Sequence, residues 1–356
     1  MSQRYLIMAG GTGGHVFPAL AVAKALMAQG HQVEWLGTVR GLEAKVVPSA
    51  GIQLHCLNIA GVRGRGIRQL LLAPWLIVKS VFTVRQILRR FKPAVVIGLG
   101  GYVAGPGGLA AFLSRIPLLI HEQNAVAGTT NRLLARLARR VLCAFPKVLP
   151  GAINVGNPLR LNFYQQADPA QRFNQRDGAP RLLVLGGSLG AQALNQMVPK
   201  ALALLPVEAR PLVRHQTGSQ HAAGCELAYQ ERQLNARVEP FIDDVAEALA
   251  WADLVICRAG ALTVAELSAV GVGAILVPYP HAIDDHQTAN AQWLVAQQAA
   301  LLAPQESLNA ERLSRLLTEL LPDRARLCAM ATAARAAATP DATEAFVQHI
   351  LELTHG

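Results

Sequence analysis

Short apolar runs alternate with amphipathic helical stretches along most of the chain, and this alternation predicts its fold class. In the first half the runs lie at 4–10, 31–37, 94–100, 116–123 and 139–145. In the second half they lie at 181–187, 209–218, 252–260 and 273–280. Strands that are buried on both faces of a parallel sheet are apolar throughout, and helices connect them. The pattern therefore indicates an α/β protein with helices on both faces of parallel sheets.

Two stretches read as copies of one unit, "LIMAGGTGGHVFPALAVAKAL" at 6–26 and "LVLGGSLGAQALNQMVPKAL" at 183–202. Each joins an apolar strand, a glycine-rich turn and an amphipathic helix, which predicts two Rossmann-like domains in tandem. The segment 156–180 between them is polar and rich in Pro and Gly, as linkers are. We place the boundary near Asn157–Arg160, and the amphipathic C-terminal stretch could belong to either domain.

Glycine-rich turns follow three of the predicted strands: "GGTGGH" at 10–15, "GLGGYVAGPGG" at 98–108 and "GGSLG" at 186–190. A glycine turn between a strand and a helix exposes backbone N–H groups at the positive end of the helix dipole, where phosphate binds. A single turn of this kind is as often explained by the tight connection between strand and helix, which requires glycine, as by phosphate binding. Three of them at the carboxyl ends of strands favour a phosphate-binding site.

Two familiar motifs compete for these turns. The dinucleotide fingerprint requires a small residue where Val16 stands, and an acid at the end of the second strand, where this chain has none. The turn at 186–190 matches the nucleophile elbow of α/β-hydrolases, with Ser188 as nucleophile, Asp253, and His281 or His286. The hydrolase alternative leaves the first 160 residues unexplained, and NAD binding is disfavoured.

Charge is distributed unevenly. Residues 1–160 carry 19 Lys and Arg but only three acids, whereas the remainder carries 14 basic and 20 acidic residues. The first half is therefore expected to face an anionic partner, either nucleic acid or a membrane surface with anionic lipid. No nucleic-acid-binding motif is present, and the few aromatic residues disfavour base stacking.

The basic segment 62–92 mixes eight Lys or Arg with Leu, Trp and Phe and contains no acid. We expect Pro74 to break it, and its apolar core is too short to span a bilayer. It is predicted to lie in a membrane interface, on an anionic surface. The alternative is a buried helix with a solvated basic face.

The five cysteines are scattered without a C-x-x-C motif, which predicts reduced thiols in a cytosolic protein, with no disulfide framework or zinc site. A strand begins within five residues of Met1, so we expect no signal peptide. Near 263 the T-x-x-E pattern of Thr263 and Glu266 fits a capping box at the start of a helix. Alternatively, Glu266 accepts hydrogen bonds from a ribose diol.

Seven stretches, in order, resemble the MurG family of N-acetylglucosaminyltransferases, glycosyltransferase family 28. They are "GGTGGHVFPALAVAKAL", "GLGGYVAGPGG", "HEQNAVAGTTNRLLA", "VGNPLR", "LGGSLGAQALN", "FIDDVAEALAWADLVICRAGALTVAELSAVG" and "DDHQTANA". The resemblance covers nearly the whole chain. It implies a GT-B fold, with two Rossmann-like domains whose parallel sheets face a central cleft. The expected domains are 1–159, completed by the final helix 338–356, for acceptor and membrane, and 160–337 for the donor.

The same resemblance implies the reaction. The family transfers GlcNAc from UDP-GlcNAc, with inversion, to the 4-hydroxyl of MurNAc in lipid I, which gives lipid II for peptidoglycan synthesis. A peripheral protein on the cytoplasmic face of the inner membrane is expected, without nucleic acid as partner. Another UDP-sugar-dependent GT-B transferase remains the alternative.

The resemblance also implies which residues contact the donor, since the family's donor contacts fall on matching positions of this chain. These are Thr12, Gly13, Gly14, Asn124, Arg160, Ser188, Ile242, Ala261, Leu262, Thr263, Val264, Ala265, Glu266 and Gln287. Backbone groups at Ile242 suit a uracil edge, and Glu266 suits the ribose. Ser188 suits the α-phosphate and Arg160 the departing UDP. The amides of Asn124 and Gln287 suit sugar hydroxyls.

Transfer to a hydroxyl requires a general base. His15 is the first candidate, although it could equally bond only the donor's phosphate or sugar, and Glu122 is the second. His121 is expected to be structural. No D-x-D motif occurs, so we expect neither an essential metal nor a cofactor, with helix ends and Arg160 supplying positive charge.

Overall fold

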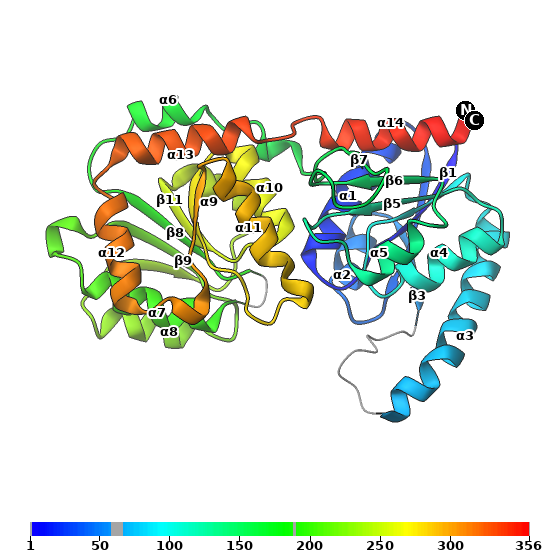
Figure 1. The fold of residues 1–356 in the computed structure, drawn as a ribbon, viewed down its shortest axis with the longest axis horizontal. Coiled ribbons are helices and arrows are strands. Elements are labelled where there is room, and N and C mark those ends of the chain that lie inside the picture. Colours follow the sequence, from blue (N-terminus) through cyan, green and yellow to red (C-terminus); the bar gives the residue numbers. More distant parts are fainter. Residues whose placement is uncertain (1, 58–66, 188–189, 356) are drawn as a thin grey trace. The chain divides into compact units, whose positions relative to one another are not determined.

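The computed structural model describes residues 2–57, 67–187 and 190–355. The chain divides into two compact units (Figure 1). Unit 1 comprises Met1–Leu159 together with Asp341–Gly356, and unit 2 comprises Arg160–Pro340. Each unit has its own parallel sheet with helices packed on both faces, so the predicted α/β class is confirmed.

Unit 1 contains a seven-stranded parallel sheet in the order β3-β2-β1-β4-β5-β6-β7. Its strands are β1 (Arg4–Met8), β2 (Gln32–Thr38), β3 (Gln53–Leu57), β4 (Val95–Gly98), β5 (Leu118–Glu122), β6 (Arg140–Cys143) and β7 (Ile153–Asn154). Its helices are α1 (Gly13–Ala28), α2 (Glu43–Ser49), α3 (Ile67–Phe91), α4 (Ala104–Leu113), α5 (Thr129–Leu134) and α14 (Ala342–His355).

Alternate residues of β1 divide the core of unit 1 into two layers, because successive side chains of a strand point to opposite faces. Tyr5 and Ile7 pack with α1 and with Phe346 of α14. Leu6 and Met8 pack with α3 and α4 on the other face. The last helix therefore completes the hydrophobic core of unit 1, although it follows the whole of unit 2 in the sequence.

Unit 2 contains a six-stranded parallel sheet in the order β10-β9-β8-β11-β12-β13. Its strands are β8 (Arg181–Leu185), β9 (Leu212–Gln216), β10 (Ala236–Glu239), β11 (Leu254–Cys257), β12 (Gly273–Leu276) and β13 (Ala300–Leu302). Its α-helices are α6 (Pro169–Asn174), α7 (Gln192–Ala203), α8 (Ala222–Gln230), α9 (Val245–Trp251), α10 (Ala261–Val270), α11 (His286–Ala296), α12 (Ala310–Leu320) and α13 (Arg324–Ala336). Short 3-10 turns lie at Leu161–Phe163, Val207–Ala209, Ile283–Asp285 and Gln305–Ser307.

All nine predicted strands are present, and the described residues form four further strands that the sequence pattern missed. The missed strands are β3, β7, β10 and β13, and each of them lies at an edge of its sheet. An edge strand is covered less completely than a central one, so it needs no continuous apolar run. Strand β7, for example, is only two residues long and exposed.

The expectation that Pro74 breaks the basic segment is wrong, because α3 runs from Ile67 to Phe91 without interruption. A proline inside a helix removes one intrahelical hydrogen bond and often kinks the helix rather than ending it. The C-terminal half of α3 is held by Val84 and Leu88, which are buried among residues of α4. Within the described parts of the chain, no helix combines the length and apolarity needed to cross a membrane.

Candidate active site

The strand order reverses between β1 and β4 in unit 1 and between β8 and β11 in unit 2. In open parallel sheets, ligands bind outside the carboxyl ends of the strands at such a switch point. The three glycine-rich turns follow β1, β4 and β8, so each lies at the switch point of its unit. The placement of these turns at the carboxyl ends of strands is therefore confirmed.

In unit 1 the turns after β1 and β4 touch one another. A Cβ added at Gly101 would lie 2.4 Å from the carbonyl oxygen of Gly10. A Cβ added at Gly100 would lie 2.5 Å from Cδ2 of His15. Both Gly100 and Gly101 also have positive φ, which L side chains rarely adopt. Glycine is therefore required here both for close approach and for backbone conformation.

His15 occupies the first turn of α1, with Thr12 as the N-cap residue and Gly13 and Gly14 as the first helical residues. The Thr12 side chain makes no capping hydrogen bond. The first N–H groups of any helix lack intrahelical acceptors and can bind an anion. The imidazole, half-buried beside Gly100, therefore stands next to a potential anion-binding turn.

Glu122, at the carboxyl end of β5, is buried and surrounded by hydrogen-bond donors. Its Oε1 accepts from the backbone N and the Nδ2 of Asn124, at 3.0 and 3.2 Å. Its Oε2 accepts from the N of Gly128 at 3.0 Å and from Nδ2 of Asn131 at 2.8 Å. Four donors fill the accepting capacity of the two oxygens, so this carboxylate organises the loop that carries Asn124.

His121 precedes Glu122 but points into the core. Its Nε2 lies 2.9 Å from the carbonyl oxygen of Gly156, and its ring packs against Phe346. Burial lowers the pKa of His121 to about 4, so the ring is neutral near pH 7 and donates to Gly156. These contacts support the structural role expected of this residue.

In unit 2 the helix after β11 begins at Ala261, with Gly260 as its N-cap. Thr263 is therefore the third residue of α10, and the capping-box interpretation of Thr263 and Glu266 is wrong. A cap residue must stand outside the helix, where its side chain can reach the free N–H groups. Ala261, Leu262, Thr263, Val264, Ala265 and Glu266 together form the first turns of α10.

Glu266 is half-buried, and it is the most strongly perturbed carboxyl group of unit 2. Burial raises the pKa of Glu266 to about 8, and the opposing attraction of the Arg160 charge is smaller. A raised pKa on a carboxyl group at a switch point is typical of a functional site. Arg160 itself is exposed and lies over the ring of Phe163.

Two further expected contacts lie in loops of unit 2. Ile242 is buried in the turn after β10. Gln287, in the first turn of α11, accepts a hydrogen bond at Oε1 from the backbone N of Tyr279 at 2.9 Å. Because a backbone N–H can only donate, this contact fixes the orientation of the amide and leaves Nε2 to donate to a ligand. Ser188 lies outside the described residues.

Sequence reasoning missed Arg258, which stands between β11 and Gly260. Its guanidinium donates to the carbonyl oxygens of Val277 and Pro278, each at 3.1 Å, and to Oε1 of Gln305 at 2.6 Å. It thus ties the carboxyl ends of β11 and β12 together beside α10. An arginine between a strand and a glycine turn was the only available signal.

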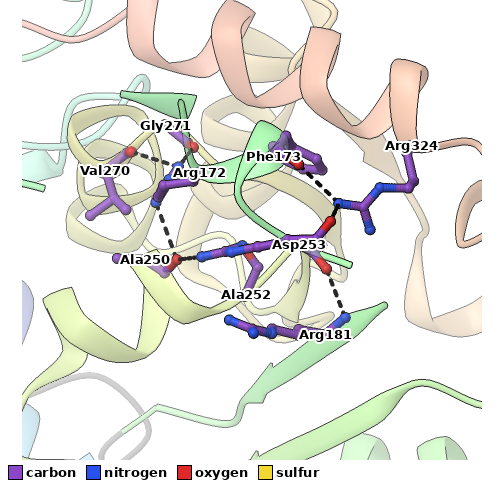
Figure 2. Close-up of polar contacts among 10 residues, drawn as sticks. Arg172, Phe173, Arg181, Ala250, Ala252, Asp253, Val270, Gly271 and Arg324 are labelled. Carbon is purple, nitrogen blue, oxygen red and sulfur yellow. Dashed lines mark hydrogen bonds and ion pairs between the residues drawn. The ribbon is translucent and has the colours of Figure 1, made fainter. Parts of the chain in front are cut away.

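The hydrolase alternative fails on geometry. Asp253 precedes β11 and therefore lies at the amino edge of the sheet, opposite to the glycine turns. One of its oxygens accepts from the guanidinium of Arg176 at 2.6 Å. The other accepts from the N of Arg181 at 2.9 Å (Figure 2). Nearby, Arg172 donates to the last carbonyl oxygens of α10 at Val270 and to Gly271. Asp253 therefore belongs to a cluster of arginines at the amino edge of the sheet.

Among the described residues, no group of three or more His, Cys, Asp or Glu side chains is arranged to hold a metal ion. The sequence contains two contiguous acidic pairs, Asp243-Asp244 and Asp284-Asp285, and one member of each makes a local hydrogen bond. Asp244 caps α9 by accepting from the N of Glu247, and Asp285 accepts from the hydroxyl of Thr288.

Two doubly wound α/β units in tandem, each with glycine turns at its switch point, are the arrangement of the GT-B fold. The model of the glycosyltransferase family 28 N-terminal domain matches residues 5–143, and that of its C-terminal domain matches residues 181–346. The chain belongs to glycosyltransferase family 28.

Relatives match over the full length. A protein of Alkalilimnicola ehrlichii is 55% identical, covering 99% of both chains, and one of Marinobacter nauticus is 52% identical, covering 99% of this chain and 98% of the relative. Both bear the name UDP-N-acetylglucosamine–N-acetylmuramyl-(pentapeptide) pyrophosphoryl-undecaprenol N-acetylglucosamine transferase. The crystal structure of Acinetobacter baumannii MurG is 44% identical with a TM-score of 0.86, covering 98% of this chain and 99% of that one.

Proposed function

We propose that this chain transfers GlcNAc from UDP-GlcNAc to the 4-hydroxyl of MurNAc in lipid I and so makes lipid II. The observation that carries the proposal is the full-length identity of 52–55% to proteins named UDP-N-acetylglucosamine–N-acetylmuramyl-(pentapeptide) pyrophosphoryl-undecaprenol N-acetylglucosamine transferase. The glycine turns at both switch points suit the two diphosphates that the reaction involves, one on each substrate.

The donor is proposed to bind unit 2. The positive end of α10 and the turn after β8 stabilise the diphosphate, and backbone groups at Ile242 hold the uracil. Glu266 accepts from the ribose diol. Arg160 neutralises the departing UDP, as a cation does where charge develops. Helix N-termini and this guanidinium supply the positive charge, so the reaction proceeds without an essential metal.

The base is proposed to be His15. The acceptor 4-hydroxyl attacks C1 of GlcNAc, the bond from C1 to the UDP oxygen breaks, and His15 takes the hydroxyl proton. The half-buried ring stands at the turn 10–14 and against Gly100. Glu122 is the weaker candidate, because four donors already occupy its oxygens. A general base contributes about 10²–10⁴-fold.

Labelled UDP-GlcNAc incubated with a lipid I analogue tests the proposal. We expect a β-linked GlcNAc product with the wild type, and a decrease in kcat of at least about 100-fold in His15→Ala. The amide of Asn replaces the hydrogen bonds of His but not its basicity, so His15→Asn should be equally slow. Donor binding without any product from the wild type would instead indicate a nucleotide-sugar sensor. Near-wild-type turnover in both variants would exclude His15 as the base.

Glu266 gives a pH dependence with a definite sign. Its pKa is raised to about 8 in the free protein, and ribose hydroxyls donate best to the ionised form, so binding expels a proton below pH 8. The KM for UDP-GlcNAc should therefore decrease as the pH rises towards 8, and this dependence should disappear in Glu266→Gln.

Glu266→Ala should raise the KM for UDP-GlcNAc about 10-fold or more, because the ribose hydroxyls lose a charged acceptor. Thr263→Ser should change it little. Loss of thermal stability in Glu266→Ala at unchanged KM would contradict the role.

Membrane attachment through α3 on the cytoplasmic face of the inner membrane is the second part of the proposal. Trp75, Val78 and Phe82 are exposed by 68%, 60% and 62%, which is unusual for large apolar side chains. Farther along the helix, Arg89 and Arg90 are also exposed. Apolar side chains next to cations suit the interface of a bilayer with anionic lipids.

Two double variants should therefore bind phosphatidylglycerol vesicles at least about fivefold more weakly. The first, Trp75→Ser with Phe82→Ser, removes apolar side chains from the interface. The second, Arg89→Glu with Arg90→Glu, removes cations that each contribute about 1 kcal/mol. Transfer to a short-chain soluble acceptor should persist. Leu204→Ser with Val207→Ser, an equally exposed apolar pair in unit 2, is the matched control. Unchanged vesicle binding in both α3 variants would refute this placement.

A further inference from the structure

The first 160 residues contain only three acids, and the structure gives each of them a partner within the protein. Glu34 lies 2.6 Å from Nε2 of His55, and Glu122 organises the loop of Asn124. The third, Glu43, is completely buried at the start of α2. The proposed reaction makes no use of Glu43, although burying a carboxylate costs free energy unless it is fully hydrogen-bonded.

The Glu43 carboxylate connects the glycine turn after β1 to the end of β2. Its Oε2 accepts from the backbone N of Gly11 at 2.9 Å. Its Oε1 accepts from the backbone N and the hydroxyl of Thr38, at 2.9 and 2.7 Å. The Thr38 hydroxyl in turn accepts from the N of Gly41 at 3.2 Å. One side chain therefore orders two loops at the carboxyl edge of the sheet.

Three glycines leave room for this carboxylate. A Cβ added at Gly10, Gly37 or Gly41 would lie 2.6, 2.6 or 2.0 Å from an atom of the Glu43 side chain. Real Cβ atoms do not approach other atoms so closely, so the side chain occupies space that three separate positions must leave empty. The Glu43 site thus depends on residues from the turn after β1, from β2 and from the loop before α2.

Both backbone polar groups of Gly11 make hydrogen bonds to the segment around α2. Its N–H donates to Glu43, and its carbonyl oxygen accepts from the N of Leu42 at 3.4 Å. Its φ of +94° lies in the region that favours glycine. Gly11 directly precedes Thr12, the N-cap of α1, so its orientation determines where the first amides of α1 and the ring of His15 point.

We propose that Glu43 is a positioning residue for the transfer reaction, which holds the turn 10–14 and thereby aims His15 and the first amides of α1 at the substrate. This inference rests on the proposed function. The negative charge is essential to the role, since Gly11 and Thr38 each present an N–H to a different oxygen of Glu43. A glutamine can accept from only one of them, and its NH₂ group would face the other N–H.

Glu43→Gln tests the inference. We expect kcat, counted per mole of UDP-binding sites, to fall about 10–100-fold, because small misplacements of reacting groups lower the rate by such factors. The KM for UDP-GlcNAc should change less than about threefold, because the main donor contacts are proposed in unit 2. Amide hydrogen exchange of the segment 9–16 should accelerate at least about tenfold relative to that of α7, because an opened turn loses its protection.

Asp253→Asn is the matched control, since Asp253 is equally buried and also accepts from a backbone N–H, but at the amino edge of the unit 2 sheet. It should leave kcat per binding site and exchange at 9–16 unchanged, whatever its effect on thermal stability. Should Glu43→Gln fail to fold, Thr38→Val removes only the hydroxyl that donates to Oε1, and it should show the same two changes to a smaller degree.

A kcat within threefold of wild type in folded Glu43→Gln would overturn the inference, and so would an unchanged kcat in Thr38→Val where Glu43→Gln does not fold. An equal loss of kcat in Asp253→Asn would overturn it as well. The wild type separates this failure from failure of the proposed function. If the wild type transfers no GlcNAc, the proposed function is wrong, and the exchange of 9–16 still reports whether Glu43 holds the turn.

Discussion

Backbone N–H groups of glycine turns and helix N-termini at the carboxyl edges of two parallel sheets are the feature on which the proposed site depends. In each unit the strand order reverses once, and ligands of open parallel sheets bind outside the carboxyl ends of the strands at such a point. In unit 1 this edge is ordered by two buried carboxylates, Glu43 and Glu122, which bind backbone N–H groups of the adjoining loops. Helices α1 and α10 begin at the same edges, and helix N-termini favour anions.

The same arrangement explains the unequal charge of the chain. The first 160 residues place their three acids where they are buried or paired, so their charges are satisfied within the protein: Glu34 by His55, and Glu43 and Glu122 by backbone and side-chain donors. The exposed side chains of this part of the chain include Arg89 and Arg90. An excess of exposed cations attracts anionic partners at long range.

Central strands and glycine turns could be predicted from the sequence, because burial on both faces imposes continuous apolar runs. Edge strands such as β7 could not, since they carry no such run. The capping-box prediction at Thr263 failed because the local pattern T-x-x-E does not show that the helix already begins at Ala261. The tie between Glu43 and Gly11 spans 32 positions, so no local pattern reveals it. Arg258 is likewise explained only by the strand that lies next to β11.

A crystal structure of the full chain with UDP-GlcNAc tests the central claim most directly, namely that the switch point of unit 2 binds the donor. The account predicts the diphosphate at the N-terminus of α10 and at the turn after β8, with the uracil beside Ile242 and the ribose hydroxyls on Glu266. A donor bound only to the turn 10–15 of unit 1, without contact to α10, would contradict it.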